Sequence, residues 1–237
     1  AASDVYKRQI LNRAFRIRLV SSNVREVFLI GSDFIYQLFI GLLITFASGY
    51  ALTLNEQLMI QVLALGILPI AIIEIVIALV LGIRLAKMHP LTMKILYVIY
   101  SILTGVTFSV IFVAFEVSSL ISIFIITAII FALLAFYGYT TKRDLTKIGT
   151  IALIALLAII IAGILNIFIF KSTMFDTVLT MLGVLIFIAY IAYDVNKVKQ
   201  LMLAIGEEKA AVYGAFQLYL DFINLFIRLL ELFGKRR

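Results

Sequence analysis

The segment LYLDFINLFIRLLELFG, which runs from Leu218 to Gly234, places four polar residues at helical spacing in an apolar stretch. The four are Asp221, Asn224, Arg228 and Glu231, and steps of four towards the N-terminus add Gln217 and Tyr213. Spacings of three and four residues put all of them on one face of a helix. Carboxylates on such a face can bind protons or a hard cation such as Ca²⁺, and an apolar helix with a polar stripe needs a polar partner.

The best partner for Asp221 is Asp194, which stands where the preceding apolar run gives way in IFIAYIAYDVNKVKQ. Another acid, Asp176, lies five helical turns earlier, near the same face but at the other end of that run. Glu74 lies within a run of Ile, Val and Leu, and Arg84 lies near the end of that run. An ionisable group inside a bilayer costs at least a few kcal/mol, so such groups normally face the interior of a bundle and pair with one another. We therefore predict that Asp194 faces Asp221 across two antiparallel helices.

The composition of the chain indicates that these ionisable residues lie within a membrane. Of the 237 residues, 64% are hydrophobic and 14% are charged, and the mean hydropathy is +1.17. One soluble core of this size could not bury so much apolar surface, so the natural solvent is a bilayer. The chain has no cysteine and a single histidine, His89, which excludes thiolate metal sites and a histidine-based charge relay within one chain. Because no phosphate-binding glycine loop is present either, we expect no enzyme and no cofactor.

Seven apolar runs of membrane-spanning length predict an all-α integral membrane protein. We place them at residues 34–54, 58–83, 95–115, 119–139, 149–170, 174–195 and 211–233. The second run is longer than a bilayer requires, so we expect it to tilt or to extend past the surface. Small residues within the runs suit close helix packing, namely Gly105, Ser109, Gly163 and Gly183.

The basic residues outside these runs predict the orientation of the chain. Fifteen of them fall on the side of the N-terminus, and four fall on the other side, at Lys171 and in the tail 235–237. We therefore predict a cytoplasmic N-terminus and an external C-terminus. The basic tail supports one alternative, in which six spans are followed by a re-entrant last helix. The net charge of +7 is thus mostly a topology signal, and we expect no nucleic-acid partner.

These runs divide the chain into three parts. Residues 1–30 form an N-terminal cytoplasmic segment, residues 31–234 form the membrane domain, and residues 235–237 form the basic tail. The first nine residues, AASDVYKRQ, resemble translated sequencing-adapter sequence and carry no functional argument here. Two local readings need no function: Asp144 is a helix-end or surface residue, and Arg228 can neutralise Glu231 three residues away.

Five segments resemble the successive signatures of the Bax inhibitor-1 family, also called the transmembrane Bax inhibitor motif proteins. They are YSILTGVTFSVIF (100–112), FYGYTTKRDLTKIGT (136–150), ILNIFIF (164–170), IAYDVNKVKQ (191–200) and LYLDFINLF (218–226). The resemblance covers about residues 30–234 and is strongest to the bacterial branch described as pH-sensitive calcium leak channels. It implies seven helices, with a central last helix wrapped by the other six.

The same resemblance implies roles for particular residues. A pair of aspartates that senses pH maps onto Asp194 and Asp221, and an arginine that latches this pair maps onto Arg84. In bacterial relatives an arginine near the final FG pairs with the glutamate of the second span, here Glu74. This sequence has Glu231 at that position and Arg228 one turn earlier, so Arg228 becomes the candidate partner of Glu74.

Two carboxylates about 4 Å apart at an effective dielectric of ~20 repel by about 4 kcal/mol, which is enough for the pair to titrate in the physiological pH range without any histidine. With one proton the two acids hold their helices together, and with none they repel and become oxygen ligands suited to transient Ca²⁺ binding. The hypothesis is a passive, pH-dependent Ca²⁺ leak channel, with Asp176 attracting cations at its outer mouth. Two alternatives remain: a non-transporting regulator of a membrane protease or cell-death protein, and a proton-coupled cation antiporter.

Overall fold

The computed structural model describes residues 33–84, 87–205 and 207–237, and within them it is helical without a named strand. The first described helix is Asp33–Thr53. It is followed by α2 (Glu56–Leu65), α3 (Leu68–Arg84), α4 (Pro90–Ala114), α5 (Val117–Thr140), α6 (Thr146–Leu165) with the π-helical turn η2 (Asn166–Phe170), α7 (Thr173–Ile205) and α8 (Glu207–Phe233). The predicted all-α membrane fold is confirmed. The N-terminal segment 1–30 lies outside the described residues.

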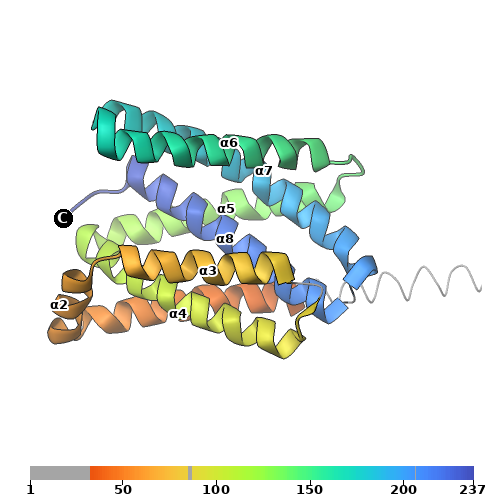
Figure 1. Ribbon diagram of the computed structural model, residues 1–237, viewed down its shortest axis with the longest axis horizontal. Helices are drawn as coiled ribbons and strands as arrows, with labels where there is room; N and C mark the ends of the chain where they lie inside the picture. The colour runs from red at the N-terminus through yellow and green to blue at the C-terminus, as the bar shows by residue number, and fades with distance from the viewer. Residues whose placement is uncertain (1–32, 85–86, 206) are drawn as a thin grey trace, which may run out of the picture.

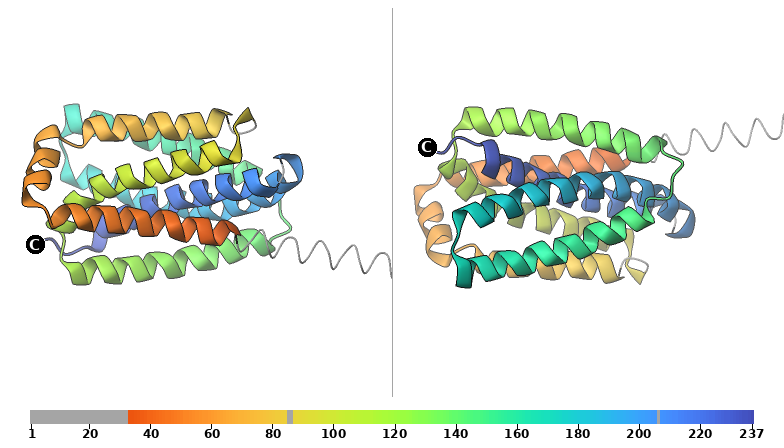
Figure 2. Two further views of the ribbon diagram at one scale, coloured as in Figure 1. Left: turned by 90° about the horizontal axis from the view of Figure 1, so that it is seen from below. Right: turned by 90° about the horizontal axis from the view of Figure 1, so that it is seen from above.

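The helices run back and forth along one long axis, and loops connect them at the two ends of the bundle (Figure 1). Six of the described helices are long and apolar enough to cross a membrane, and the number is seven if the bent pair α2–α3 is counted as one span. The helix Asp33–Thr53 begins at one end and the C-terminus lies at the other, as both views in Figure 2 also show. Because α8 runs the length of the bundle, the arrangement matches seven crossings rather than a re-entrant last helix.

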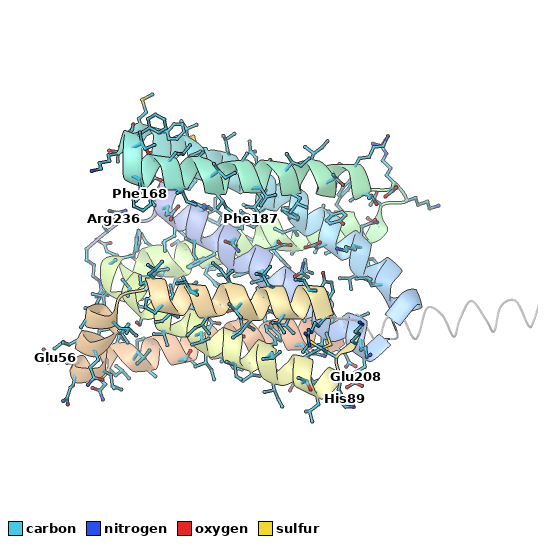
Figure 3. The ribbon with its side chains drawn as sticks, in the orientation of Figure 1. Glu56, His89, Phe168, Phe187, Glu208 and Arg236 are labelled. Carbon is cyan, nitrogen blue, oxygen red and sulfur yellow. The ribbon has the colours of Figure 1, made fainter. Side chains whose placement is uncertain are left out.

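The polar ends of this bundle are marked by single residues in Figure 3, which shows His89 and Glu208 at one end and Glu56 and Arg236 at the other. At the first end Lys94 Nζ lies 2.8 Å from Glu208 Oε1, which joins the start of α4 to the start of α8. Because this ion pair is exposed, it contributes little to the free energy of unfolding. It marks the end of the apolar part of the bundle.

The second span differs from the single helix predicted over 58–83. The chain bends by 78° between α2 and α3. The bend occurs at Gly66, which has φ 78° and ψ 164°, a backbone conformation that side-chain-bearing residues rarely adopt. Pro69 in the first turn of α3 then fixes the start of the new helix. The 17 residues of α3 run along the bundle for about 25 Å at 1.5 Å per residue, while α2 lies across the end of the bundle (Figure 1).

Helix α8 is the centre of the bundle. Of its membrane window 78% is buried, against 11% for α6, which packs on the outer side of α7. Aromatic side chains fill the space around α8: the ring of Phe226 lies 5.7 Å from Phe108 of α4 and 5.8 Å from Phe46 of the first described helix, measured between centroids. Such rings bury large areas at fixed geometry, so they set the position of α8 against α4 and the first helix.

The small residues named from the sequence have different environments. At Gly105 an added Cβ would lie 2.7 Å from the carbonyl oxygen of Thr45, so glycine permits the close approach of α4 to the first described helix. Ser109 is fully buried, and Gly183 lies against the side chain of Arg228. Around Gly163 an added Cβ would meet no atom within 4 Å, so the expectation that Gly163 is a packing site was wrong.

Candidate functional site

The two predicted acids lie together between α7 and α8. These helices form an antiparallel pair, which brings Asp194, in the second half of α7, to the level of Asp221 near the middle of α8 (Figure 1). Both residues are buried, with 4% of Asp194 and 5% of Asp221 exposed. Their carboxyl groups form a side-chain hydrogen bond with each other. The prediction that Asp194 faces Asp221 across the hairpin therefore describes the geometry that is observed.

A hydrogen bond between two carboxyl groups has a chemical requirement. An ionised carboxyl group can only accept, so one of the two acids must carry the proton that joins them. Asp221 Oδ2 is buried and receives no N–H or O–H donor from the described residues. The shared proton joins the two oxygens in contact and leaves Asp221 Oδ2 without a donor, which costs less for a neutral carboxyl group than for a charged one. The arrangement thus favours one proton held jointly by Asp194 and Asp221.

Lys197 is a member of this site that sequence reasoning missed. It lies one turn after Asp194 on α7, and its positive charge acts on the Asp194 carboxyl group. Its ammonium group hydrogen-bonds to the hydroxyls of Tyr193 and Tyr213 and lies 5.5 Å from the centroid of the Tyr193 ring. From the sequence, Lys197 is one of the fifteen basic residues that predict the orientation of the chain. The signal that could have identified it is its spacing of three residues from Asp194.

Two further residues of the polar stripe on α8, Arg228 and Glu231, also face α7. Arg228 Nη1 lies 3.3 Å from Glu231 Oε2, three residues further along the same helix. The same Glu231 oxygen accepts a hydrogen bond of 3.2 Å from the Thr180 hydroxyl of α7. Arg228 and Glu231 therefore neutralise each other, and Arg228 does not take the place of the family arginine beside Glu74.

Glu74 instead has a hydroxyl partner. Thr104 Oγ1 of α4 lies 2.6 Å from Glu74 Oε1, within the membrane-spanning part of the bundle. Arg84 is exposed at the end of α3, and among the described contacts it makes no ion pair with Asp194 or Asp221. The structure thus does not show the predicted latch. Asp176 is exposed in the first turn of α7, at the end of that helix opposite to Asp194, and it does not join the pair.

The site does not resemble a permanent metal centre. Within the described ranges no group of three or more His, Cys, Asp or Glu side chains could hold a metal ion. Two carboxyl groups offer four oxygens, whereas Ca²⁺ takes six to eight oxygen ligands in typical sites. An ion between Asp194 and Asp221 would keep several of its water molecules. That favours transient passage over tight binding.

Comparison with known proteins identifies the family of this bundle. Residues 33–237 match the model of the family described as inhibitor of apoptosis-promoting Bax1. The chain is 36% identical over 212 residues to the Escherichia coli inner membrane protein YbhL, and the aligned region covers 84% of this chain and 88% of YbhL. It is 37% identical over 224 residues to a Borreliella burgdorferi protein, covering 90% of this chain and 96% of the relative. A Streptococcus pyogenes membrane protein is 36% identical over 168 residues, with 70% and 72% covered.

The matched region contains every described helix, including both helices that supply the aspartate pair. The inner-membrane relative agrees with the apolar helices of this chain, so the protein is a multi-pass membrane protein. The chain belongs to the Bax inhibitor-1 family.

Proposed function

We propose that this protein is a passive Ca²⁺ leak channel whose conductance depends on pH through the Asp194–Asp221 pair. The observation that carries the proposal is the hydrogen bond between these two buried carboxyl groups, which come from neighbouring helices. A carboxyl pair within a membrane bundle is costly and has no structural need, because two apolar side chains would pack the same helices without desolvating polar groups.

The pair can work as a proton-controlled contact between α7 and α8. With one shared proton, the acids are joined and the two helices are held together. When that proton leaves, two negative charges face each other in a medium of low dielectric, where they repel and attract a divalent cation. Lys197 supplies a positive charge beside Asp194, which makes the doubly ionised state more accessible than it would be in an apolar site. Asp176, exposed at the other end of α7, would draw cations towards that mouth.

The test is Ca²⁺ flux into liposomes that contain the purified protein, measured across a range of pH. The wild-type flux should change with pH, and Asp194→Asn and Asp221→Asn should each flatten the profile, because asparagine cannot exchange a proton. Asp144→Asn is the matched control, since Asp144 is an exposed loop residue outside the site. Its profile should follow the wild type.

Other results would contradict the proposal in distinct ways. A pH profile that is unchanged in both aspartate variants would remove the sensor role of the pair. Flux that requires an imposed proton gradient would identify an antiporter. If pure wild-type protein passes no Ca²⁺ and a membrane protein co-purifies with it, the regulator alternative replaces the channel.

A further inference from the structure

A second polar cluster lies on the other side of α8 from the aspartate pair. Tyr219 and Asp221 are two residues apart, so they point about 200° apart around the helix axis. Tyr219 is fully buried and faces the first described helix and α4, whereas Asp221 faces α7. The cluster around Tyr219 contains Glu74 of α3 and the hydroxyl residues Thr45, Ser101 and Thr104. Neither the aspartate pair nor its mechanism uses these groups.

The hydroxyl groups of this cluster form a connected network. Thr45 Oγ1 donates to the carbonyl oxygen of Ser101 at 2.9 Å, and it lies 2.5 Å from the Tyr219 hydroxyl. Ser101 Oγ donates to the carbonyl oxygen of Tyr97 at 2.9 Å. Thr104 Oγ1 lies 3.1 Å from the carbonyl oxygen of Tyr100 and 2.6 Å from Glu74 Oε1. The Thr104 and Ser101 hydroxyls also face the Tyr219 hydroxyl.

Counting protons assigns the donors in this network, because a hydroxyl group has one proton and a carbonyl oxygen has none. The Thr45 proton serves the Ser101 carbonyl, so the short contact between Thr45 and Tyr219 uses the Tyr219 proton. The Ser101 proton serves the Tyr97 carbonyl. Thr104 has one proton for two acceptors, the Tyr100 carbonyl oxygen and Glu74 Oε1, and a protonated Glu74 would supply the second proton that these two contacts need.

The charges around Glu74 also favour a protonated, neutral carboxyl group. Among the described residues, the titratable groups that face it are Tyr100 of α4 and Tyr219 of α8, while the first helix presents Thr45, and none of these is basic. Arg84 is ten residues further along α3, about 15 Å at 1.5 Å per residue, and Arg228 is paired with Glu231. An ionised Glu74 would therefore be a charge within the membrane without a counter-ion, which costs several kcal/mol.

We infer that Glu74 is a second proton-binding site, in which a neutral carboxyl group donates a hydrogen bond to Thr104 and joins α3 to α4 and α8. The ligand is a single proton, and the site is separate from the aspartate pair. It does not depend on the Ca²⁺ leak: the channel proposal can fail while the Glu74 site stands, and the reverse also holds. The chain then carries two proton sites on opposite faces of its central helix.

Infrared spectroscopy of the full-length protein in liposomes tests this directly, because a protonated carboxylic acid has a C=O stretch separate from that of a carboxylate. In the background Asp194→Asn/Asp221→Asn, the protonated-acid band at neutral pH should persist, and adding Glu74→Gln should remove it. Glu231→Gln is the matched control, because Glu231 is exposed and paired with Arg228, and it should leave the band unchanged.

Thr104→Val gives a second reading that keeps Glu74 in place and preserves the shape of the threonine. Loss of the acceptor should move the Glu74 band to a higher frequency, the position of a free acid. A background without a protonated-acid band at neutral pH would overturn the inference. A band that Glu74→Gln leaves intact, or that Thr104→Val does not move, would overturn it as well.

Discussion

Lys197 and Asp194 stand one turn apart on α7, and the charge of the first acts on the protonation of the second. In the proposed mechanism this ammonium group helps Asp194 and Asp221 to lose their shared proton. Its hydrogen bonds to Tyr193 and Tyr213 hold it at the site. In that mechanism the half-buried Lys197 would set the pH range of the Ca²⁺ flux, apart from its contribution to orientation.

Replacing Lys197 should move the pH response without abolishing it. In Lys197→Met the doubly ionised pair loses its neighbouring positive charge, so the midpoint of the Ca²⁺ flux profile should shift to higher pH by about one unit, which corresponds to about 1.4 kcal/mol. Lys197→Arg keeps the charge and should stay near the wild type. A midpoint in Lys197→Met that is unchanged, or that moves to lower pH, would show that the ammonium group does not act on the pair.

Asp144 offers a prediction outside the membrane-spanning segments. Its Oδ1 accepts hydrogen bonds from the Thr146 hydroxyl at 2.5 Å and from the Thr146 backbone N–H at 2.9 Å, which caps the start of α6. These donors, the hydroxyl first, hold the pKa of Asp144 below its usual value. The stabilisation is therefore present above the pKa of the unfolded chain and is lost as pH falls through the lower folded value.

Asp144→Ala should speed hydrogen exchange of the backbone amides in the first turn of α6, whereas Asp144→Asn, which keeps an acceptor, should change it little. The difference between wild type and Asp144→Ala should vanish in acid, where the carboxyl group is protonated. Equal exchange in the alanine and wild-type proteins at neutral pH would contradict the capping role.

The two acids of the site could be predicted from the sequence, because ionisable residues are rare within membrane-spanning runs and each one stands out. Their hydroxyl partners could not. The chain has many threonines and serines within its spans, and nothing in the sequence distinguishes Thr104, which contacts Glu74, from the others. The resemblance to the family implied a charged partner for Glu74, whereas the structure shows the Thr104 hydroxyl beside it.

At the scale of helices, two glycines within spans make a matched test of packing. An added Cβ at Gly138 of α5 would lie 2.4 Å from the carbonyl oxygen of Ala192 on α7, while at Gly163 of α6 it would meet nothing within 4 Å. Gly138→Ala must push α5 away from α7, so we expect a loss of about 1–3 kcal/mol, as for other overpacked sites. Gly163→Ala should be neutral or more stable by up to about 1 kcal/mol, the gain in helix propensity.

Thermal unfolding of both variants in the same detergent measures this difference. Equal stability of Gly138→Ala and Gly163→Ala would mean that α5 and α7 are not held at the observed separation.

The spans were mostly predictable because hydropathy reports the length of chain that must lie in lipid. The ends of the helices were less predictable than the spans. Helix α4 begins at Pro90, whereas the apolar run begins at residue 95, because a helix can continue past the apolar run through polar residues such as Thr92 and Lys94. The bend between α2 and α3 escaped prediction, since the apolar run continues on both sides of it. Gly66 followed by Pro69 was the available signal.

For the whole molecule, the basic tail no longer argues against seven crossings. Lys235 Nζ lies 3.0 Å from Glu116 Oε1, and Arg237 N donates to the carbonyl oxygen of Ala114 at 3.0 Å. The guanidinium of Arg236 lies 5.7 Å from the centroid of the Phe115 ring. The tail thus packs on the connection between α4 and α5, at the same end of the bundle as the end of α8. Its charges have local partners and need not follow the distribution that orients the chain.

Cysteine labelling can determine the orientation, since the sequence contains no cysteine that would interfere. Lys142 precedes α6, and Lys171 follows η2 at the other end of the same span. A membrane-impermeant maleimide should label Lys171→Cys in intact spheroplasts, and should label Lys142→Cys only after permeabilisation. The reverse pattern would invert the proposed orientation, and labelling of both from outside would contradict a crossing between them.

In the proposed mechanism Ca²⁺ takes the place of the proton that Asp194 and Asp221 share. Proton release on adding Ca²⁺ to the purified protein, followed with a pH indicator in weak buffer, measures this most directly. We expect about one proton released per bound ion in the wild type, and none in Asp194→Asn or Asp221→Asn. Ca²⁺ binding without proton release in the wild type, or equal release in the two variants, would contradict the account.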